Sequence, residues 1–241
     1  MTPPKRNPET GEPWRNFYGR RHGKKLRPGH AGLIDTRLAD LSPPGIGWDE
    51  NPDRRTLDLH ALYPAAREFW FEIGFGGGEH MLATAEANPD IQIIGAEPFI
   101  NGVAKLLAAV ERSGVRNAAI TDADARDVMD VLPDASIART FLLYPDPWPK
   151  TRHHKRRFMN PSQLDQLARV MAPGAELRVA TDIEDYVRHA LEVVDRHPDF
   201  LWTAERPADW REPWPGWHRT RYEAKAIREG RTPHYLIFCR S

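Results

Sequence analysis

The stretch FWFEIGFGGG, residues 69–78, indicates the fold of this chain. Its apolar, aromatic-rich first part is typical of a buried strand, and it ends in glycines at alternate positions. Glycine permits a tight turn and lets a ligand approach the backbone closely. We therefore expect the first strand of a sheet to run into a ligand-binding loop.

Downstream of this stretch, segments typical of strands and helices alternate at short spacing. Further strands are expected over 91–97, 117–121, 138–144, 176–181, 200–203 and 235–239, and helices over 79–87, 100–112, 125–132, 161–171 and 183–196. This alternation predicts an α/β fold with a doubly wound, mostly parallel sheet of seven strands. In such sheets ligands bind beyond the carboxyl ends of the strands, near the switch in strand order.

Residues 1–64 differ from the rest because they contain nine prolines and little apolar periodicity. We expect a basic, irregular and partly disordered N-terminal arm over 1–64, with a short helical piece near 33–41, and a folded domain over 65–241. No stretch suits a signal peptide or a membrane span, so we expect a cytoplasmic protein without membrane contact. The single Cys239 excludes an internal disulfide and cysteine-rich metal sites.

The chain has 34 basic and 34 acidic residues, but these charges are segregated. Residues 65–131 hold five basic and eleven acidic groups, whereas the run KTRHHKRR at 150–157 holds five basic groups and no acid. Segments 1–30 and 206–231 are also basic. Local charge, rather than the sum, sets the field that a polyanion meets. A nucleic-acid partner is therefore compatible with zero net charge, although a solvated face is the ordinary role of a basic run.

Carboxylates follow the ends of the first two strands. Glu72 precedes the glycine turn and Glu79 follows it, and the third glycine comes one residue earlier than in the dinucleotide fingerprint. Two acids disfavour a pyrophosphate and suit an ammonium or a sulfonium, both of which S-adenosylmethionine carries. Glu97 ends the second strand, where a carboxylate can accept hydrogen bonds from the ribose hydroxyls of NAD or of S-adenosylmethionine. A purely structural glycine turn is the alternative.

The third loop offers two more carboxylates. Asp122 or Asp124 could bind the amino group of an adenine, while Asp124 could instead cap the helix that begins at 125. The sequence leaves both choices open.

The fourth strand runs into the loop YPDPWPK at 144–150. Its three prolines stiffen it, so that it can hold Asp146 and Trp148 in place. Trp148 could stack on a nucleobase whose edge bonds to Asp146, although a rigid turn with a buried tryptophan and a capping aspartate is the alternative. The basic run at 150–157 follows directly, and this position favours phosphate binding by the substrate. Its adjacent histidines have weak spacing for a metal.

Together these motifs resemble the bacterial tRNA (guanine-N7-)-methyltransferase family. The resemblance is carried by FEIGFGGG at 71–78, Glu97, PDPWPK at 145–150, RHHKRR at 152–157, ATD at 180–182 and TRYE at 220–223. The segment RNFYGRRHGKKLR at 15–27 also looks like the basic N-terminus of that family. The resemblance implies a Rossmann-like class I S-adenosylmethionine-dependent fold, and methylation of N7 of the variable-loop guanine of tRNA to 7-methylguanosine.

The resemblance also implies roles for particular residues. The cofactor S-adenosyl-L-methionine would be bound by Glu72, Gly74, Gly76, Gly78, Glu97 and Asp124, with Asp124 fitting the family pattern better than Asp122. Asp146 would be the catalytic or base-positioning acid. Substrate contacts would come from Lys150, Asp182, Thr220, Arg221, Tyr222 and Glu223. RNA contacts would come from Arg152, His153, His154, Lys155, Arg156 and Arg157. Pro149 stands where the family often has a histidine. We expect no metal and no obligate protein partner, and either a monomer or a homodimer.

Some of these residues have structural alternatives, and the whole chain has functional ones. Asp182 could cap the helix at 183, and Thr220 with Glu223 could form a capping box. A small-molecule methyltransferase would share the glycine turn but would not need the basic run at 150–157. An NAD-dependent dehydrogenase is disfavoured by the early third glycine and by Glu72. A catalytically inactive RNA-binding module would leave the acidic pocket without a use.

Overall fold

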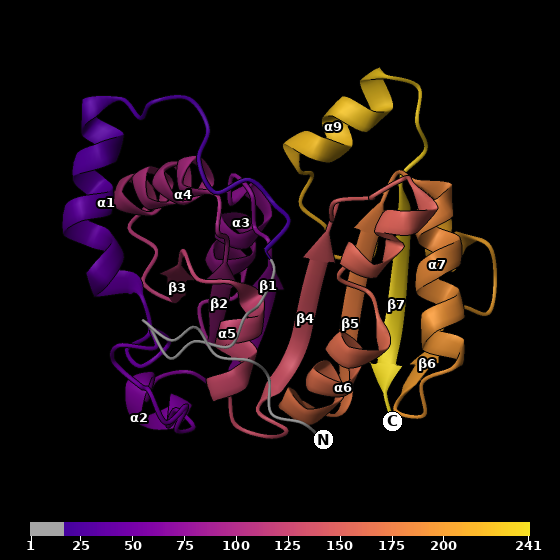
Figure 1. Ribbon diagram of the computed structural model, residues 1–241, viewed down its shortest axis with the longest axis horizontal. Coiled ribbons are helices and arrows are strands. Elements are labelled where there is room, and N and C mark those ends of the chain that lie inside the picture. The colour runs from indigo at the N-terminus through magenta and orange to yellow at the C-terminus, as the bar shows by residue number, and fades with distance from the viewer. Residues whose placement is uncertain (1–16) are drawn as a thin grey trace.

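The computed structural model describes residues 17–241, which form a seven-stranded sheet of order β3-β2-β1-β4-β5-β7-β6 (Figure 1). The strands are β1 (Glu68–Ile73), β2 (Ile91–Ala96), β3 (Ala118–Thr121), β4 (Ile137–Leu143), β5 (Met171–Thr181), β6 (Phe200–Trp202) and β7 (His234–Arg240). The first five pair in parallel, while β7 is antiparallel to both of its neighbours. The predicted α/β fold with a mostly parallel sheet is confirmed.

Helices cover both faces of the sheet. They are α1 (Pro28–Leu41), α2 (Leu59–Leu62), α3 (Glu79–Ala87), α4 (Ile100–Ser113), α5 (Ala125–Val131), α6 (Pro161–Val170), α7 (Glu184–Asp195), α8 (Ala208–Arg211) and α9 (Arg221–Arg228), with a 3-10 helix η1 (Thr151–Arg156). Side chains of α5, α6 and α7 fill one apolar cluster, and those of α3 and α4 fill another. In β1, Phe71 belongs to the first cluster and Trp70 to the second, as the alternation of side chains along a strand requires.

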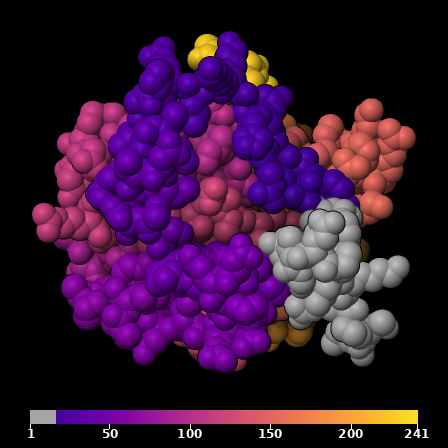
Figure 2. Space-filling model, turned by 60° about the vertical axis from the view of Figure 1, so that its left-hand side comes forward, coloured from indigo at the N-terminus to yellow at the C-terminus, as the bar shows by residue number. Residues whose placement is uncertain are grey.

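The described part of 1–64 carries more regular structure than we expected from the sequence. Helix α1 packs against α4 and β3, and Ile46 and Leu59 are buried in the cluster of α5, α6 and α7. The guanidinium of Arg54 donates to the carbonyl oxygens of Ile46 (2.6 Å) and Asp127. In Figure 2 the indigo and violet segments lie over the magenta part of the domain. The remainder of the expected arm, residues 1–16, lies outside the described residues.

The ends of the helices predicted within 65–241 agree with the structure to within one residue, but strand β5 begins earlier than expected. A helix is expected over 161–171 and a strand over 176–181, but α6 ends at Val170 and strand β5 already begins at Met171. Met171 already pairs with Ile137 of β4, and the register then shifts before Glu176 pairs with Arg139. Pairing across the sheet therefore begins the strand earlier than the local sequence indicates. Within 17–241, no helix has the length and apolar character needed to cross a membrane.

Candidate active site

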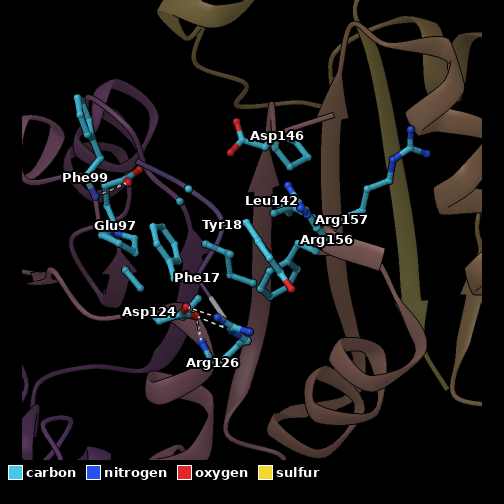
Figure 3. A pocket seen from close by; sticks show the side chains of 18 of the residues that line it. Phe17, Tyr18, Glu97, Phe99, Asp124, Arg126, Leu142, Asp146, Arg156 and Arg157 are labelled. Carbon is cyan, nitrogen blue, oxygen red and sulfur yellow. Dashed lines mark hydrogen bonds and ion pairs between the residues drawn. The ribbon is translucent and has the colours of Figure 1, made fainter. Parts of the chain in front are cut away.

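A cavity of about 510 Å³ opens at the carboxyl ends of β1, β2, β3 and β4. Its wall includes Gly74 and Gly76 after β1, Glu97 after β2, Asp124 after β3 and Asp146 after β4. The strand order turns back at β1, which has β2 on one side and β4 on the other. Figure 3 shows Glu97, Asp124 and Asp146 around this cavity, which has the size and position expected of a small-molecule site.

The glycine turn after β1 is shaped by close backbone contacts. Gly76 has φ of +58°, a conformation that disfavours any side chain. A Cβ on Gly102 of α4 would lie 2.0 Å from the carbonyl oxygen of Gly76, so α4 approaches the turn as closely as two backbones allow. Gly74 also lines the cavity, whereas Gly78 lies outside its wall and begins α3 as the N-cap.

Glu97 joins the ends of β1 and β2. Its Oε2 accepts a hydrogen bond from the backbone N–H of Gly76 (2.7 Å), and its Oε1 accepts one from that of Phe99 (2.9 Å). Burial raises the pKa of the Glu97 carboxyl, and these two backbone donors oppose the shift. Each oxygen retains acceptor capacity, so the carboxylate can also receive hydrogen bonds from a ligand in the cavity.

Asp122 and Asp124 have different positions relative to the cavity. Asp124 lines the cavity, whereas Asp122 is exposed and lies outside its wall. The carboxylate of Asp124 also caps α5 by accepting from the backbone N–H of Arg126 (2.9 Å), and it pairs with the Arg126 guanidinium (2.6 Å). Asp124 therefore caps α5, as the alternative interpretation expected, and it also lines the cavity.

Glu72 does not face the cavity. Its Oε2 lies 2.7 Å from Nδ1 of His80 in the first half of α3, and both side chains are 2% exposed. The neighbouring Ile73 lines the cavity instead, because successive side chains of β1 point to opposite faces of the sheet. The expectation that Glu72 is directed into the same pocket as the glycine turn is not met, and its partner His80 belongs to none of the sequence motifs.

The proline-rich loop after β4 holds Asp146 at the mouth of the cavity. Two non-glycine residues of this loop, Tyr144 (φ +50°) and Trp148 (φ +41°), have left-handed backbone conformations. Such conformations persist only where the surroundings enforce them. Although the carboxyl of Asp146 is partly open to solvent, the protein around it excludes enough water to raise its pKa.

The 3-10 helix η1 continues from this loop and carries much of the basic run. The Arg156 guanidinium lies over the rings of Tyr18 (4.5 Å) and Trp148 (4.9 Å), at the edge of the cavity. Arg152 and Lys155 are exposed, as is Lys150 just before η1. Fewer basic side chains are therefore accessible to a polyanion than the sequence of residues 150–157 suggests.

The side chain of Arg157 is the clearest exception within the basic run, because it is 0% exposed. Its Nε donates to the carbonyl oxygen of Pro147 (2.8 Å), and its Nη2 pairs with Asp185 of α7. A buried guanidinium with these partners cannot reach an RNA phosphate, so the expected RNA contact at Arg157 does not fit the structure. His154 is half-buried and lies 3.6 Å from Asp185, and His153 meets the ring of Trp148 edge-on.

The substrate residues expected after β5 and in the segment TRYE have different surroundings. Asp182 forms an ion pair with Arg231 and does not cap α7. Thr220 caps α9 by accepting from the N–H of Glu223 (3.1 Å). Glu223 is 2% exposed, and its carboxylate accepts from Trp217 Nε1 (2.8 Å) and the Tyr235 hydroxyl (2.5 Å). The Thr220 half of the expected capping box therefore forms, whereas the Glu223 carboxylate bonds to Trp217 and Tyr235.

Two residues of this segment lie near the cavity. Tyr222 lines it and is 43% exposed, with its ring stacked on Tyr144 at 6.4 Å between centroids. The Arg221 Nη2 donates to the Tyr222 hydroxyl at 3.0 Å. Helix α9 thus brings an aromatic ring to the cavity wall, from a part of the chain remote from the glycine turn. In Figure 1 this yellow helix lies above the upper end of β4.

Part of the cavity wall comes from residues to which no sequence motif assigns a role. Phe17 and Tyr18 close one side of it, and Phe99, Asn160 and Gln163 contribute elsewhere. The backbone of this N-terminal segment is bound to α4, because the carbonyl oxygen of Arg21 accepts from the N–H of Ile100 at 3.0 Å. The only sequence signal for Phe17 and Tyr18 was their place in the segment 15–27, whose role no local pattern specified.

Comparisons with known proteins agree on one family. A family model described as "Putative methyltransferase" matches residues 66–236. The chain is 61% identical over 228 residues to the tRNA (guanine-N(7)-)-methyltransferase of Roseobacter denitrificans, covering 95% of this chain and 97% of that protein. It is 49% identical over 225 residues to the protein of the same name from Rhodospirillum rubrum, covering 93% of this chain and 87% of that protein.

Solved structures share the fold at low sequence identity. An antibiotic-related methyltransferase is 13% identical, with a TM-score of 0.53 over 78% of this chain and 98% of that one. The 16S rRNA methyltransferase KamB is 18% identical, with a TM-score of 0.52 over 78% of this chain and 95% of that one. These two likenesses show a Rossmann-like methyltransferase architecture.

Proposed function

The chain belongs to the tRNA (guanine-N(7)-)-methyltransferase family, and we propose that it transfers a methyl group from S-adenosyl-L-methionine to N7 of the variable-loop guanine of tRNA. The observation that carries this proposal is the shared wall of one cavity. Glu97 and Asp146 lie in that wall, and the Asp146 loop continues into the exposed basic residues of η1. A cofactor site, an acid beside it and a polyanion surface are thus contiguous.

The residues of the inner cavity suit this cofactor. Glu97 has free acceptor capacity for the two ribose hydroxyls, and Asp124 can accept from the adenine amino group. A Cβ on Gly74 would meet no atom within 4 Å, so the turn leaves open space beside the backbone. The acids Glu97 and Asp146 are compatible with a cationic ligand and unfavourable for a pyrophosphate. When bound, the cofactor supplies an electrophilic methyl group on its sulfonium.

The protein's own contribution is to position the guanine. N7 of guanine has an in-plane lone pair and no proton, so no strong general base is required. Orientation of N7 toward the methyl group is then the main source of the rate gain. Asp146 can act on the base in either of two ways: its carboxylate stabilises the positive charge that arrives on the guanine, or it accepts from the guanine N1–H and amino group.

The rigid loop and its neighbours give the base a defined environment. Trp148 and Tyr222 both line the cavity and present aromatic rings on which a base can stack. N7 lies on the major-groove edge, so the guanine must be exposed before it can enter. The exposed Lys150, Arg152 and Lys155 then bind phosphates of the tRNA backbone.

Incubation of the full chain with tRNA and methyl-labelled S-adenosylmethionine tests the proposal. We expect label in tRNA, and strand cleavage at a variable-loop guanine after reduction and aniline treatment, which cuts at 7-methylguanine. Asp146→Ala should bind the cofactor and lose most of the transfer. Label in another RNA or in a small molecule, with none in tRNA, would replace this function with a different methyl acceptor.

A further inference from the structure

Arg157 lies beside the loop of Asp146 and forms part of the cavity wall, while its guanidinium bonds to protein groups. Its Nε donates to the carbonyl oxygen of Pro147, the residue that follows Asp146. Its Nη2 pairs with Oδ2 of Asp185, and its Nη1 donates to the Asp185 carbonyl oxygen at 3.4 Å. One buried cation thus connects the loop after β4 to the first turn of α7, and Asp185 lies 28 residues beyond Arg157 in the chain.

The loop at the other end of this connection needs an external restraint. Tyr144 and Trp148 have positive φ values on either side of Asp146 and Pro147. Non-glycine residues keep such conformations only where the surroundings hold them. Pro147 has no N–H, so its carbonyl oxygen is its only backbone hydrogen-bonding group, and Arg157 is the donor that it meets.

Asp185 is suited to anchor the guanidinium. It lies in the first turn of α7, where the helix dipole favours a negative charge, and its side chain is 47% exposed. The hydrogen bond from Arg157 lowers the pKa of the Asp185 carboxyl, which stays ionised at neutral pH. Tyr186 completes the site because its ring lies 5.5 Å from the guanidinium carbon.

We propose that Arg157 and Asp185 are a positioning pair that holds the loop of Asp146 in the conformation required for methyl transfer. The inference rests on the proposed function, since it assigns these residues to the step in which the guanine is placed. It differs from an RNA contact, because the Arg157 side chain is inaccessible to a phosphate. A displacement of about 1 Å in a catalytic group can cost about 100-fold in rate without loss of substrate binding.

Three variants and one control test the pair by steady-state kinetics. Arg157→Gln and Asp185→Ala should lower kcat about 10- to 100-fold, with the KM for tRNA, the affinity for S-adenosylmethionine and the salt dependence of tRNA binding unchanged. Asp185→Asn retains an acceptor oxygen and should recover most of kcat. Arg188→Ala is the matched control, because Arg188 approaches the same carboxylate at 3.9 Å from an exposed position and does not touch the loop.

The double variant Arg157→Gln/Asp185→Ala should lose no more kcat than the worse single variant, as expected for two residues that act as a unit. If Arg157→Gln fails to fold, Asp185→Ala carries the test alone, since Asp185 is half exposed. An unchanged kcat in the folded variants would overturn the proposal. A weaker tRNA affinity with a shallower salt dependence would also overturn it, because that result would show that Arg157 contacts RNA.

Hydrogen exchange gives a readout that needs no activity. The segment 144–157 should exchange faster in Arg157→Gln than in the wild type, and Arg188→Ala should match the wild type. Absence of methyl transfer by the wild-type protein would contradict the proposed function alone and leave this measurement valid. Unchanged exchange in Arg157→Gln would contradict the positioning pair, whatever the activity of the wild type.

Discussion

The Oε2 of Glu97 lies 2.7 Å from the backbone nitrogen of Gly76, so the acid that ends β2 also fixes the turn that follows β1. The second oxygen of the same carboxylate binds the N–H of Phe99 at the start of α4. One side chain therefore shapes the cavity and presents acceptors to it. These two roles separate in measurements of stability and of ligand affinity.

Replacement of Glu97 should affect both properties. In Glu97→Ala two backbone N–H groups lose their acceptors, and we expect the free energy of unfolding to fall by about 1–3 kcal/mol. The affinity for S-adenosylmethionine should fall at least about tenfold, or about 1.4 kcal/mol. Urea denaturation and isothermal titration measure the two effects. Glu97→Gln keeps one amide oxygen as an acceptor and should lose less stability. A wild-type affinity of Glu97→Ala for S-adenosylmethionine would show that Glu97 does not bind the cofactor.

The raised pKa of Asp146 predicts an acid limb in the rate. If the ionised carboxylate acts on the base, kcat/KM should fall as the pH is lowered through this pKa, which is higher than that of an ordinary aspartate, because kcat/KM reports groups of the free enzyme. Asp146→Asn should have a lower kcat/KM without this limb. An equal acid limb in Asp146→Asn would assign the titration to another group.

Folding stability supplies the control for that variant. A carboxyl whose pKa is raised on folding destabilises the folded state at pH values above that pKa. Asp146→Asn should therefore unfold at the same or a higher temperature than the wild type at pH 7. A lower melting temperature would show that the carboxylate is needed for the fold rather than for the reaction.

Removal of exposed charge near η1 should weaken tRNA binding. Arg152→Ala and Lys155→Ala should each reduce the slope of log affinity against log salt concentration by about 1, because each removes one phosphate contact. Filter binding over a range of salt concentrations gives the slopes. Arg112→Ala is the control, since Arg112 is exposed at the end of α4 remote from the cavity. Equal slopes in the wild type and the three variants would show that Arg152 and Lys155 do not contact the tRNA phosphates.

Two glycine substitutions should change stability in opposite directions. In Gly102→Ala the new methyl group would lie 2.0 Å from the Gly76 carbonyl oxygen, so α4 must move away from the turn. We expect a loss of about 1–3 kcal/mol in stability, with weaker cofactor binding. In Gly32→Ala the methyl group meets nothing within 4 Å in helix α1, and we expect a gain of up to about 1 kcal/mol. Urea midpoints of the two variants test this contrast.

Local patterns in the sequence were enough for the fold, the family and the loops that carry the site. The strand over 69–75, the glycines that follow it and the acids at the ends of the next strands are short-range features, and hydrophobic periodicity encodes them directly. The family motifs are equally local. For this reason the seven-stranded sheet and the family assignment agree with the structure and the comparisons.

Tertiary contacts decided which side chains face the cavity and which are used elsewhere. Glu72 bonds to His80, Arg157 to Asp185 and Asp182 to Arg231, and each of these pairings joins separate elements of the fold. A charged residue has the same letter whether it meets solvent, a ligand or an ion-pair partner, and only the packing of distant segments distinguishes these cases. Helix α1 likewise shows weak periodicity alone and gains its apolar partners only where α4 and β3 lie against it.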